Sequence, residues 1–339
     1  MKKQTYMLRK NFICFVLVAL FYGCHSVQER EVVREKATAQ VLHNEIMTRM
    51  PGTMVVVGDY VVWEDPFARD YFVNVHEAAT GKLVGKMGKV GEGPNEFITG
   101  GISAHCVGDR LFATDANGQN RGFLSVDSLV AGKEPFQPLD AAQREARPKM
   151  TELQHGVFVK RTEDGDEAYF KANIRGHESS FGVYPVKDVR EHLGTTLAYD
   201  SVSGMLACAS FTIPYLSLYQ KQGDTFKLLW EEEAEIGYEV SRGKIVPDQR
   251  IGGIFGLSLT RDYVVSLHRD WENEPLDGPV QGRDERLIPH LVYLYDYDSH
   301  LVKVVDLGMP VVRIASDRRS NTLYAIGLNP DYMLVKYEL

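Results

Sequence analysis

The sequence predicts an all-β protein, a six-bladed β-propeller in which a strand near the N-terminus closes the last blade. Three observations predict this fold. Short β-rich runs broken by turn residues recur about every 50 residues from residue 39 onward. These runs group into six units, and the last unit reaches the C-terminus one strand short. A β-sandwich is the alternative, but it needs fewer strands and no such regular count.

The first element, residues 1–23, has the features of a secretory signal peptide. Lys2, Lys3, Arg9 and Lys10 precede an apolar run of about eleven residues that ends at Tyr22. A membrane-spanning helix needs about 20 apolar residues. We therefore expect this segment to be removed rather than kept as a transmembrane anchor.

The stretch from Leu20 to Cys24 resembles a bacterial lipobox, in which the cysteine is acylated and the chain is cut just before it. Gly23 and Cys24 match the pattern, whereas Phe21 and Tyr22 depart from it. The resemblance implies that Cys24 is the lipidation site. Multiple acyl chains hold a protein stably on a bilayer, so we expect a protein of the cell envelope, on the outer membrane. A plain signal peptide with an incidental cysteine is the alternative.

Residues 24–38 are highly charged, and we interpret them as a lipidated tether, with a short amphipathic helix as the alternative. Cleavage of the signal takes the net charge from −8 to about −12. This acidic balance, with no basic stripe, argues against a nucleic-acid partner. We expect a monomer that touches the membrane through its lipid only.

Two cysteines remain in the mature chain beyond the anchor, Cys106 and Cys208. Export permits a disulfide between them. Each lies in an apolar, strand-like stretch, however, and this context favours two buried free thiols.

The propeller is expected to span residues 39–339, and its first unit is the clearest. Met54–Val57 and Tyr60–Trp63 flank a Gly-Asp turn, and Tyr71–His76 and Lys82–Met87 form a second hairpin. Similar units begin near residues 102, 153, 196, 254 and 311. The last unit lacks a fourth strand, which would leave an exposed sheet edge, and the segment Ala39–Met47 can fill that place.

A glycine-rich segment, Thr80–Phe97 (TGKLVGKMGKVGEGPNEF), follows the first unit. It resembles the linker after the first blade of the TolB-like, six-bladed propeller lipoproteins of the bacterial envelope. The resemblance implies the fold and location, and no particular activity. Asn95 stands where Gly is usual, and Asn tolerates left-handed backbone angles. The glycines suit a sharp blade-to-blade crossover; a phosphate loop is the alternative, but it requires a following helix.

The sequence lacks the local motifs of hydrolases and metalloenzymes, so no catalytic residue, metal or cofactor is predicted. Asp115–Asn120 partly matches a calcium loop but lacks its terminal Glu, which favours a turn. His268 and His290 stand at neighbouring strand ends and could face one another. We interpret them as ordinary strand-end histidines, with a metal or acid–base role as the alternative.

Long loops are expected on one face of the propeller only. They are Gly132–Lys149, Arg175–Thr195, Glu231–Gly253 and Asp270–Pro289, whereas turns such as Gly58-Asp59 on the opposite face are tight. Loops of this length are uncommon without a function, so we expect ligands to bind at this rim, near the channel mouth. The candidate contacts are polar or aromatic residues at strand ends: Trp63, Glu64, Arg121, Arg161, Arg250, Arg269 and Trp271.

The predicted function is that of a non-catalytic envelope lipoprotein that binds a glycan, a peptide or a protein partner on the long-loop face. The alternative is a hydrolase or lyase acting on a polysaccharide or lactone, with carboxylates such as Glu64 and Asp270 as acid and base. A purely structural envelope component is a third hypothesis.

Overall fold

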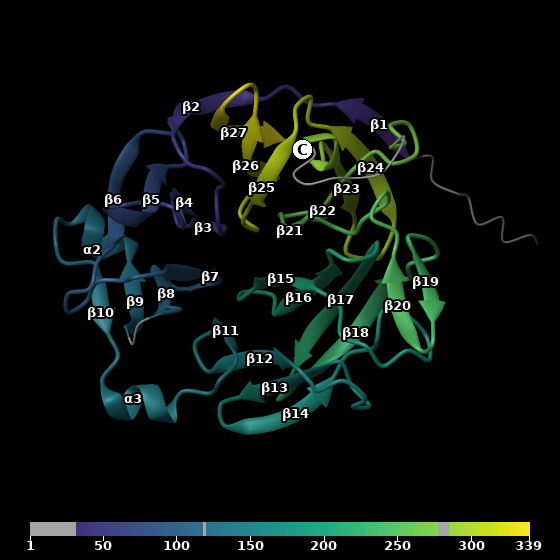
Figure 1. Ribbon diagram of the computed structural model, residues 1–339, viewed down its shortest axis with the longest axis horizontal. Helices are drawn as coiled ribbons and strands as arrows, with labels where there is room; N and C mark the ends of the chain where they lie inside the picture. The colour runs from purple at the N-terminus through teal and green to yellow at the C-terminus, as the bar shows by residue number, and fades with distance from the viewer. Residues whose placement is uncertain (1–31, 118–119, 277–284) are drawn as a thin grey trace, which may run out of the picture. The chain divides into compact units, whose positions relative to one another are not determined.

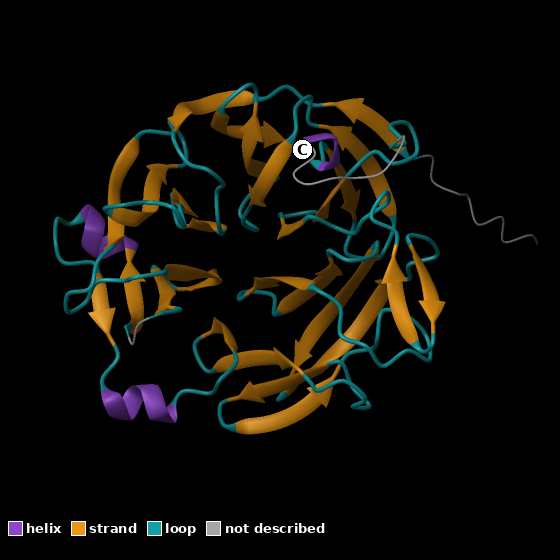
Figure 2. Ribbon diagram, in the orientation of Figure 1, coloured by secondary structure: helices purple, strands orange, loops and turns teal. Residues whose placement is uncertain are grey.

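The computed structural model describes residues 32–117, 120–276 and 285–339, and residues 32–339 form one compact unit. Within this unit, six sheets of mainly antiparallel strands surround a common axis (Figure 1), which confirms the predicted six-bladed propeller. Helices are few and lie in connections between strands (Figure 2). None of the helices in the described ranges is long and apolar enough to cross a membrane. The predicted signal peptide and Cys24 lie outside the described residues.

The first four blades are each built from four consecutive strands, counted from the axis outward. Blade 1 contains β3(Met54–Val57), β4(Tyr60–Glu64), β5(Tyr71–Glu77) and β6(Leu83–Lys89). Blade 2 contains β7(Gly100–Val107), β8(Arg110–Asp115), β9(Arg121–Ser125) and β10(Phe136–Pro138). Blade 3 contains β11(Thr151–Gln154), β12(Val157–Arg161), β13(Phe170–Ile174) and β14(His177–Phe181). Blade 4 contains β15(Thr195–Asp200), β16(Met205–Ser210), β17(Tyr215–Gln222) and β18(Thr225–Glu232).

The last two blades include strands from the N-terminal end of the described chain. Blade 5 contains β21(Gly256–Leu259), β22(Val264–His268), β23(Leu291–Tyr295) and β24(Leu301–Asp306), with β1(Val33–Lys36) added outside. Blade 6 contains β25(Val311–Ala315), β26(Thr322–Leu328) and β27(Tyr332–Glu338), with β2(Gln40–Ile46) as its outermost strand. The short helices α2(Val126–Val130) and α3(Ala141–Ala146), and the 3-10 turn η1(Glu285–Leu287), lie in connections.

Ring closure by the N-terminal segment is confirmed. β2 pairs antiparallel with β27, the last strand of the chain (Figure 1). Ile46, at the end of β2, is 5% exposed and belongs to the same core cluster as Leu334 of β27 and Trp63 of blade 1. The closing strand therefore covers the backbone edge of β27 and also contributes to the apolar layer between blades 6 and 1.

The ordered propeller begins before residue 39, the start that the sequence predicts. Val33–Lys36, part of the predicted tether, form β1, which pairs parallel with β24 of blade 5. All four side chains of β1 are exposed, and Glu35 pairs with Lys303 at 3.0 Å. Backbone hydrogen bonds alone define such an outer strand, so its charged sequence carries no apolar alternation from which it could be predicted.

Three of the predicted long loops contain strands. The range Arg175–Thr195 includes β14, Gly132–Lys149 includes β10 and α3, and Glu231–Gly253 includes a further hairpin at residues 238–247. β14 reads His-Glu-Ser-Ser-Phe and only its last residue is buried. In the same blade, residues 153–159, where the sequence predicts the third unit to begin, include a hairpin turn at Gly156, whose φ is 74°. Outer strands of a blade face solvent, so polarity does not separate them from loops.

Parts of two of these connections, Arg175–Thr195 and Glu231–Gly253, pack together beside blade 4. A cluster of buried residues joins Val186, Val189 and Leu193 of the blade 3–4 connection to Ile213 and Ile245. Ile245 belongs to an extra hairpin, β19(Tyr238–Ser241) and β20(Lys244–Pro247), and its backbone N–H donates to Glu191 at 2.6 Å. These loops therefore carry a core of their own, as functional long loops commonly do.

The glycine-rich linker is a structural crossover from blade 1 to blade 2. Asn95 adopts the left-handed conformation expected of it, with φ of 66°. The Glu96 carboxylate accepts the Gly93 N–H at 2.9 Å, and Phe97 is completely buried. Asp115 braces the far side of the linker by accepting the backbone N–H groups of Ile98 (2.8 Å) and Thr99 (2.9 Å). The Asp115 carboxylate thus holds a turn together, as the sequence favours.

Cys106 on β7 and Cys208 on β16 are both free thiols. Burial raises the pKa of Cys208 to about 12 and that of Cys106 above its ordinary value. Both therefore remain protonated at neutral pH, as expected of structural cysteines.

Candidate functional site

The long-loop face carries an open cleft beside blade 3, with a volume of about 950 Å³. We call it the blade-3 cleft. It is lined by the connections before and after the blade, by the end of β12 and by the start of β15: Lys149, Met150, Thr151, Val159, Lys160, Arg161, Thr162, Glu163, Asp164, Phe170, His192, Thr195 and Leu197. Most of these side chains are charged or carry a hydroxyl group, so the cleft is suited to hydrogen bonding rather than to apolar anchoring.

Hydrogen bonds fix the far wall of the cleft. His192 Nδ1 lies 2.8 Å from Asp164 Oδ1, and His192 Nε2 lies 3.1 Å from the Thr162 hydroxyl. The bond from His192 holds the pKa of Asp164 below its ordinary value. Tyr169 stacks near the imidazole at 4.6 Å and its hydroxyl donates to the Leu193 carbonyl. The wall is therefore preformed.

Positive charge is concentrated at the opening of the cleft. Lys149, Lys160 and Arg161 are exposed, and no carboxylate within the described ranges forms an ion pair with any of them. Arg161 Nη1 donates to the Leu193 carbonyl at 2.8 Å, which orients its guanidinium at the cleft. The lining also contains two carboxylates, Glu163 and Asp164, so three cations leave a small local excess of positive charge in a chain whose net charge is −8.

The propeller axis holds a second cavity of about 580 Å³, the channel cavity. The first strand of every blade contributes to its wall, and Leu197 of β15 lines both this cavity and the blade-3 cleft. The wall combines apolar side chains of the innermost strands, such as Val55 and Leu257, with polar and charged side chains. Polar side chains enter it at three levels, which are described in turn from the long-loop end to the tight-turn end.

At the long-loop end, Glu64 and Arg313 lie on either side of Gly52. Arg313 Nε donates to the Gly52 carbonyl at 2.6 Å, and a Cβ on Gly52 would lie only 2.9 Å from the Glu64 carboxyl group. Burial raises the pKa of Glu64 and lowers that of Arg313, while the opposite charge of each partner counteracts the shift. The Ile102 N–H donates to Glu64 at 3.2 Å. Glu64 and Arg313 are therefore both partly buried, and each stabilises the charged form of the other.

The middle level is His105, on β7. Its side chain is 8% exposed and lines the channel cavity, and burial lowers its pKa to about 4. Neither ring nitrogen has a hydrogen-bond partner in the described part of the chain, and both remain accessible from the cavity. A neutral imidazole with one donor and one acceptor thus faces the cavity.

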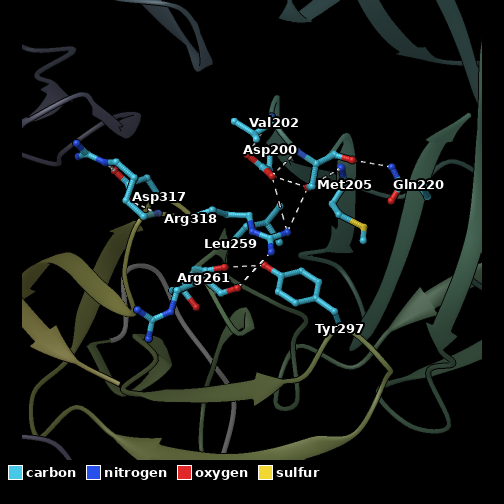
Figure 3. A network of polar contacts seen from close by, with 12 residues as sticks. Asp200, Val202, Met205, Gln220, Leu259, Arg261, Tyr297, Asp317 and Arg318 are labelled. Carbon is cyan, nitrogen blue, oxygen red and sulfur yellow. Dashed lines mark hydrogen bonds and ion pairs between the residues drawn. The ribbon is translucent and has the colours of Figure 1, made fainter. Parts of the chain in front are cut away.

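At the tight-turn end, Arg318 lines the cavity and is the centre of a network of polar contacts (Figure 3). Its guanidinium lies 4.2 Å from the centre of the Tyr297 ring and 3.8 Å from Asp200, and it donates to the Ser203 hydroxyl and the Arg261 carbonyl, each at 3.2 Å. These partners belong to blades 4 and 5, whereas Arg318 follows β25 of blade 6. One side chain thus joins three blades.

We expect Arg318→Ala to lower the free energy of unfolding by about 2 kcal/mol, because three half-buried partners lose a charged donor at once. The neighbouring Arg319→Ala is the matched control. Arg319 pairs with Asp59 and Asp317 on the surface, with 58% of its side chain exposed. Arg319→Ala should therefore lower the free energy of unfolding by less than about 1 kcal/mol. Urea denaturation measures the free energy of unfolding of both variants, and equal losses in the two would contradict the bridging role of Arg318.

The structure distributes the predicted contact residues over several places. Glu64 lines the channel cavity and Arg161 lines the blade-3 cleft. Arg269 is 3% exposed and donates to the Arg250 carbonyl, and Arg250 is exposed and paired with Asp248. The others line neither cavity: Trp63 is buried between blades 6 and 1, Arg121 is exposed at the start of β9, and Trp271 is half-buried in the loop after β22.

The two pairs of residues that the sequence suggested could act together have different partners in the structure. His268 stacks on Tyr293 at 4.2 Å and bonds the Ser266 hydroxyl, whereas His290 contacts Asp306 and Glu274. Asp270 accepts from the Asn273 amide and does not line the channel cavity that holds Glu64. The carboxylate pair needed for glycoside hydrolysis is therefore not assembled from these two residues. The described residues contain no cluster of metal-ligating side chains.

Sequence reasoning missed the side chains that line the two cavities, apart from Glu64 and Arg161. Arg313 stands alone among apolar neighbours in Val-Val-Arg-Ile-Ala, and His105 stands alone in Ile-Ser-Ala-His-Cys-Val. An isolated polar residue in the first strand of a blade is a usable signal, because that strand lines the axis. Lys149 and Lys160 give no such signal.

No protein-family model and no curated protein sequence matches the chain. Among solved structures, a member of the DUF4221 family from Bacteroides vulgatus is similar with a TM-score of 0.54 at 12% identity, covering 91% of this chain and 97% of that one. A protein from Bacteroides fragilis that is classed as exported is similar with a TM-score of 0.53 at 9% identity, covering 90% and 98%. At such identities the similarity supports the fold alone, and the fold in both cases extends over the whole propeller.

Proposed function

We propose that the protein is a non-catalytic binding protein of the cell envelope that holds an acidic glycan in the blade-3 cleft. The observation that carries the proposal is that Lys149, Lys160 and Arg161 outnumber the carboxylates of the cleft lining and form no ion pair within the described ranges. Carboxylate or sulfate groups spaced along a sugar chain would replace the missing counter-charges.

The rest of the lining favours a glycan over a peptide. Thr151, Thr162 and Thr195 supply hydroxyl groups, and His192 supplies a ring already fixed by Asp164. Peptide sites rely on apolar pockets that take alternate side chains, whereas Val159 and Phe170 in this cleft are buried. Sugar hydroxyl groups are better matched to such a surface.

The proposed location rests on the N-terminal sequence. Cys24 follows the apolar segment in a lipobox-like context, and a charged stretch separates it from β1. We propose that Cys24 is acylated and holds the propeller at the outer membrane, as in TolB-like lipoproteins. Support also comes from the fold shared with a protein classed as exported. Metabolic labelling with an alkyne-bearing fatty acid, compared with Cys24→Ser, tests the anchor, and label retained in the variant would contradict it.

The binding proposal is tested with residues 25–339 on an array of uronic-acid-containing, sulfated and neutral oligosaccharides, together with acidic peptides. We expect acidic oligosaccharides to bind and neutral ones of the same length to bind much less. Calorimetry then compares Lys149→Gln/Lys160→Gln with the parent. The double variant should weaken binding about tenfold or more, because each lysine loses close electrostatic contacts, and the salt dependence of the affinity should fall.

The matched control is Lys82→Gln/Lys227→Gln, which removes the same charge from two exposed lysines outside both cavities. It should bind as the parent does. Equal losses in the two double variants would show a general charge effect and contradict the cleft. Preferential binding of acidic peptides would overturn the glycan assignment.

A further inference from the structure

The channel cavity contains hydrogen-bonding groups that the blade-3 cleft does not use. They come from three blades: Glu64 from blade 1, His105 from blade 2 and Arg313 from blade 6. At the tight-turn end, Arg318 lines the same cavity and is held by its contacts with blades 4 and 5.

His105 is the strongest sign of a ligand. Burying an imidazole without a hydrogen bond is costly, and His105 is 8% exposed with no partner in the described ranges. His268, which is also buried and has a pKa of about 4, differs in this respect because it bonds Ser266 at 2.8 Å. The partners of His105 therefore come from the cavity, from solvent or from a ligand that displaces it.

Arg313 also has hydrogen-bonding capacity left. Its Nε donates to Gly52 and its Nη1 to Val312, each at 2.6 Å, whereas Nη2 has no partner among the described residues and is not sealed from solvent. Two bonds to backbone carbonyls fix the plane of the guanidinium. The remaining N–H groups are therefore held in a defined direction at the cavity, a preorganised donor.

The charges at this end determine the kind of ligand. Glu64 and Arg313 have opposite charges and flank the same glycine. Together they offer donors and acceptors with no net charge, and His105 adds one of each. An anion would be repelled by Glu64 and a cation by Arg313, whereas a neutral molecule with several hydroxyl groups matches all three.

We infer that the channel cavity is a second binding site, which takes a small neutral polyol of monosaccharide size through Glu64, His105 and Arg313. The volume of about 580 Å³ is within the range of small-molecule pockets. This site is independent of the acidic glycan proposed for the blade-3 cleft, from which it is separated by Leu197.

The test is calorimetry and saturation-transfer NMR of residues 25–339 with glucose, galactose, mannose and fucose, each up to about 10 mM, a range that detects millimolar affinity. Glucuronic acid and glucosamine are the charged comparisons. We expect at least one neutral sugar to bind and the charged analogues to bind at least about tenfold more weakly. No binding by any neutral sugar, or tighter binding by a charged one, would overturn the inference.

His105→Leu provides the decisive variant because it fills the same space without hydrogen bonds. Sugar binding should fall about tenfold or more, while the melting temperature stays the same or rises by about 2–4 °C, since no protein partner is lost. His268→Leu is the matched control and should lose stability but retain sugar binding. Binding that survives His105→Leu, or fails equally in both variants, would overturn the assignment.

The cleft variant separates this site from the proposed function. Lys149→Gln/Lys160→Gln should bind the neutral sugar as the parent does, because neither lysine lines the channel cavity. Conversely, His105→Leu should retain the acidic glycan. A parallel loss of both ligands in either variant would show a single site and contradict the inference.

Discussion

Deleting residues 1–47, which removes β1 and β2, should abolish the cooperative unfolding of the propeller. The loss leaves the outer edge of β27 without its antiparallel partner, and an unpaired edge invites association with other chains. It also exposes the cluster around Ile46, whose burial alone contributes about 1.5–3 kcal/mol. We expect the truncated protein to aggregate or to melt without a sharp transition, as followed by circular dichroism and size-exclusion chromatography.

Deleting residues 1–36 is the matched control, because it removes β1 and keeps β2. The four side chains of β1 are exposed, and its ion pairs, such as Glu35 with Lys303, lie at the surface. Exposed ion pairs contribute about 0–1 kcal/mol, so this shorter deletion should shift the melting temperature by only a few degrees. A cooperative transition at the same temperature in both deletions would contradict closure by β2.

The contrast between β1 and β2 also explains which elements could be predicted. The closing strand was predictable because the sixth unit ends one strand short and an unpaired edge is unfavourable. The inner strands were predictable from their apolar residues, such as the fully buried Val61 and Val62 of β4. β1 and β14 could not be recognised, because they are outer strands whose side chains are mostly exposed. Such a strand needs an extended backbone but no particular pattern of apolar residues.

The candidate sites were less predictable for a different reason. Loop lengths predicted the long-loop face as the binding face, and two of the residues chosen there, Glu64 and Arg161, line cavities. Trp63 was chosen as an aromatic at a strand end, yet it packs between two blades because ring closure brings β26 and β27 against it. Which strand ends meet depends on the angles between blades, and no local pattern records those angles.

The second large effect is expected from Phe97→Ala, in the glycine-rich linker. Phe97 is completely buried and makes edge contacts with Phe72 of blade 1, at 5.2 Å, and with Phe136 of blade 2, at 5.0 Å. Removing such a ring costs about 3–5 kcal/mol, so we expect the melting temperature to fall by about 10 °C. Phe67→Ala, at a side chain that is 51% exposed, is the control and should change it little.

The same substitution distinguishes a crossover from a phosphate loop. In a phosphate loop, the glycine N–H groups would be available for an anion and the aromatic residue after them would have no structural role. Here the Glu96 carboxylate already accepts the Gly93 N–H, and Lys89 Nζ lies 2.6 Å from that carboxylate. The loop therefore supplies its own anion, and its turn places Phe97 between the two blades. If Phe97→Ala were as stable as the parent, the packing of Phe97 between the blades would not matter, and this role of the turn would be contradicted.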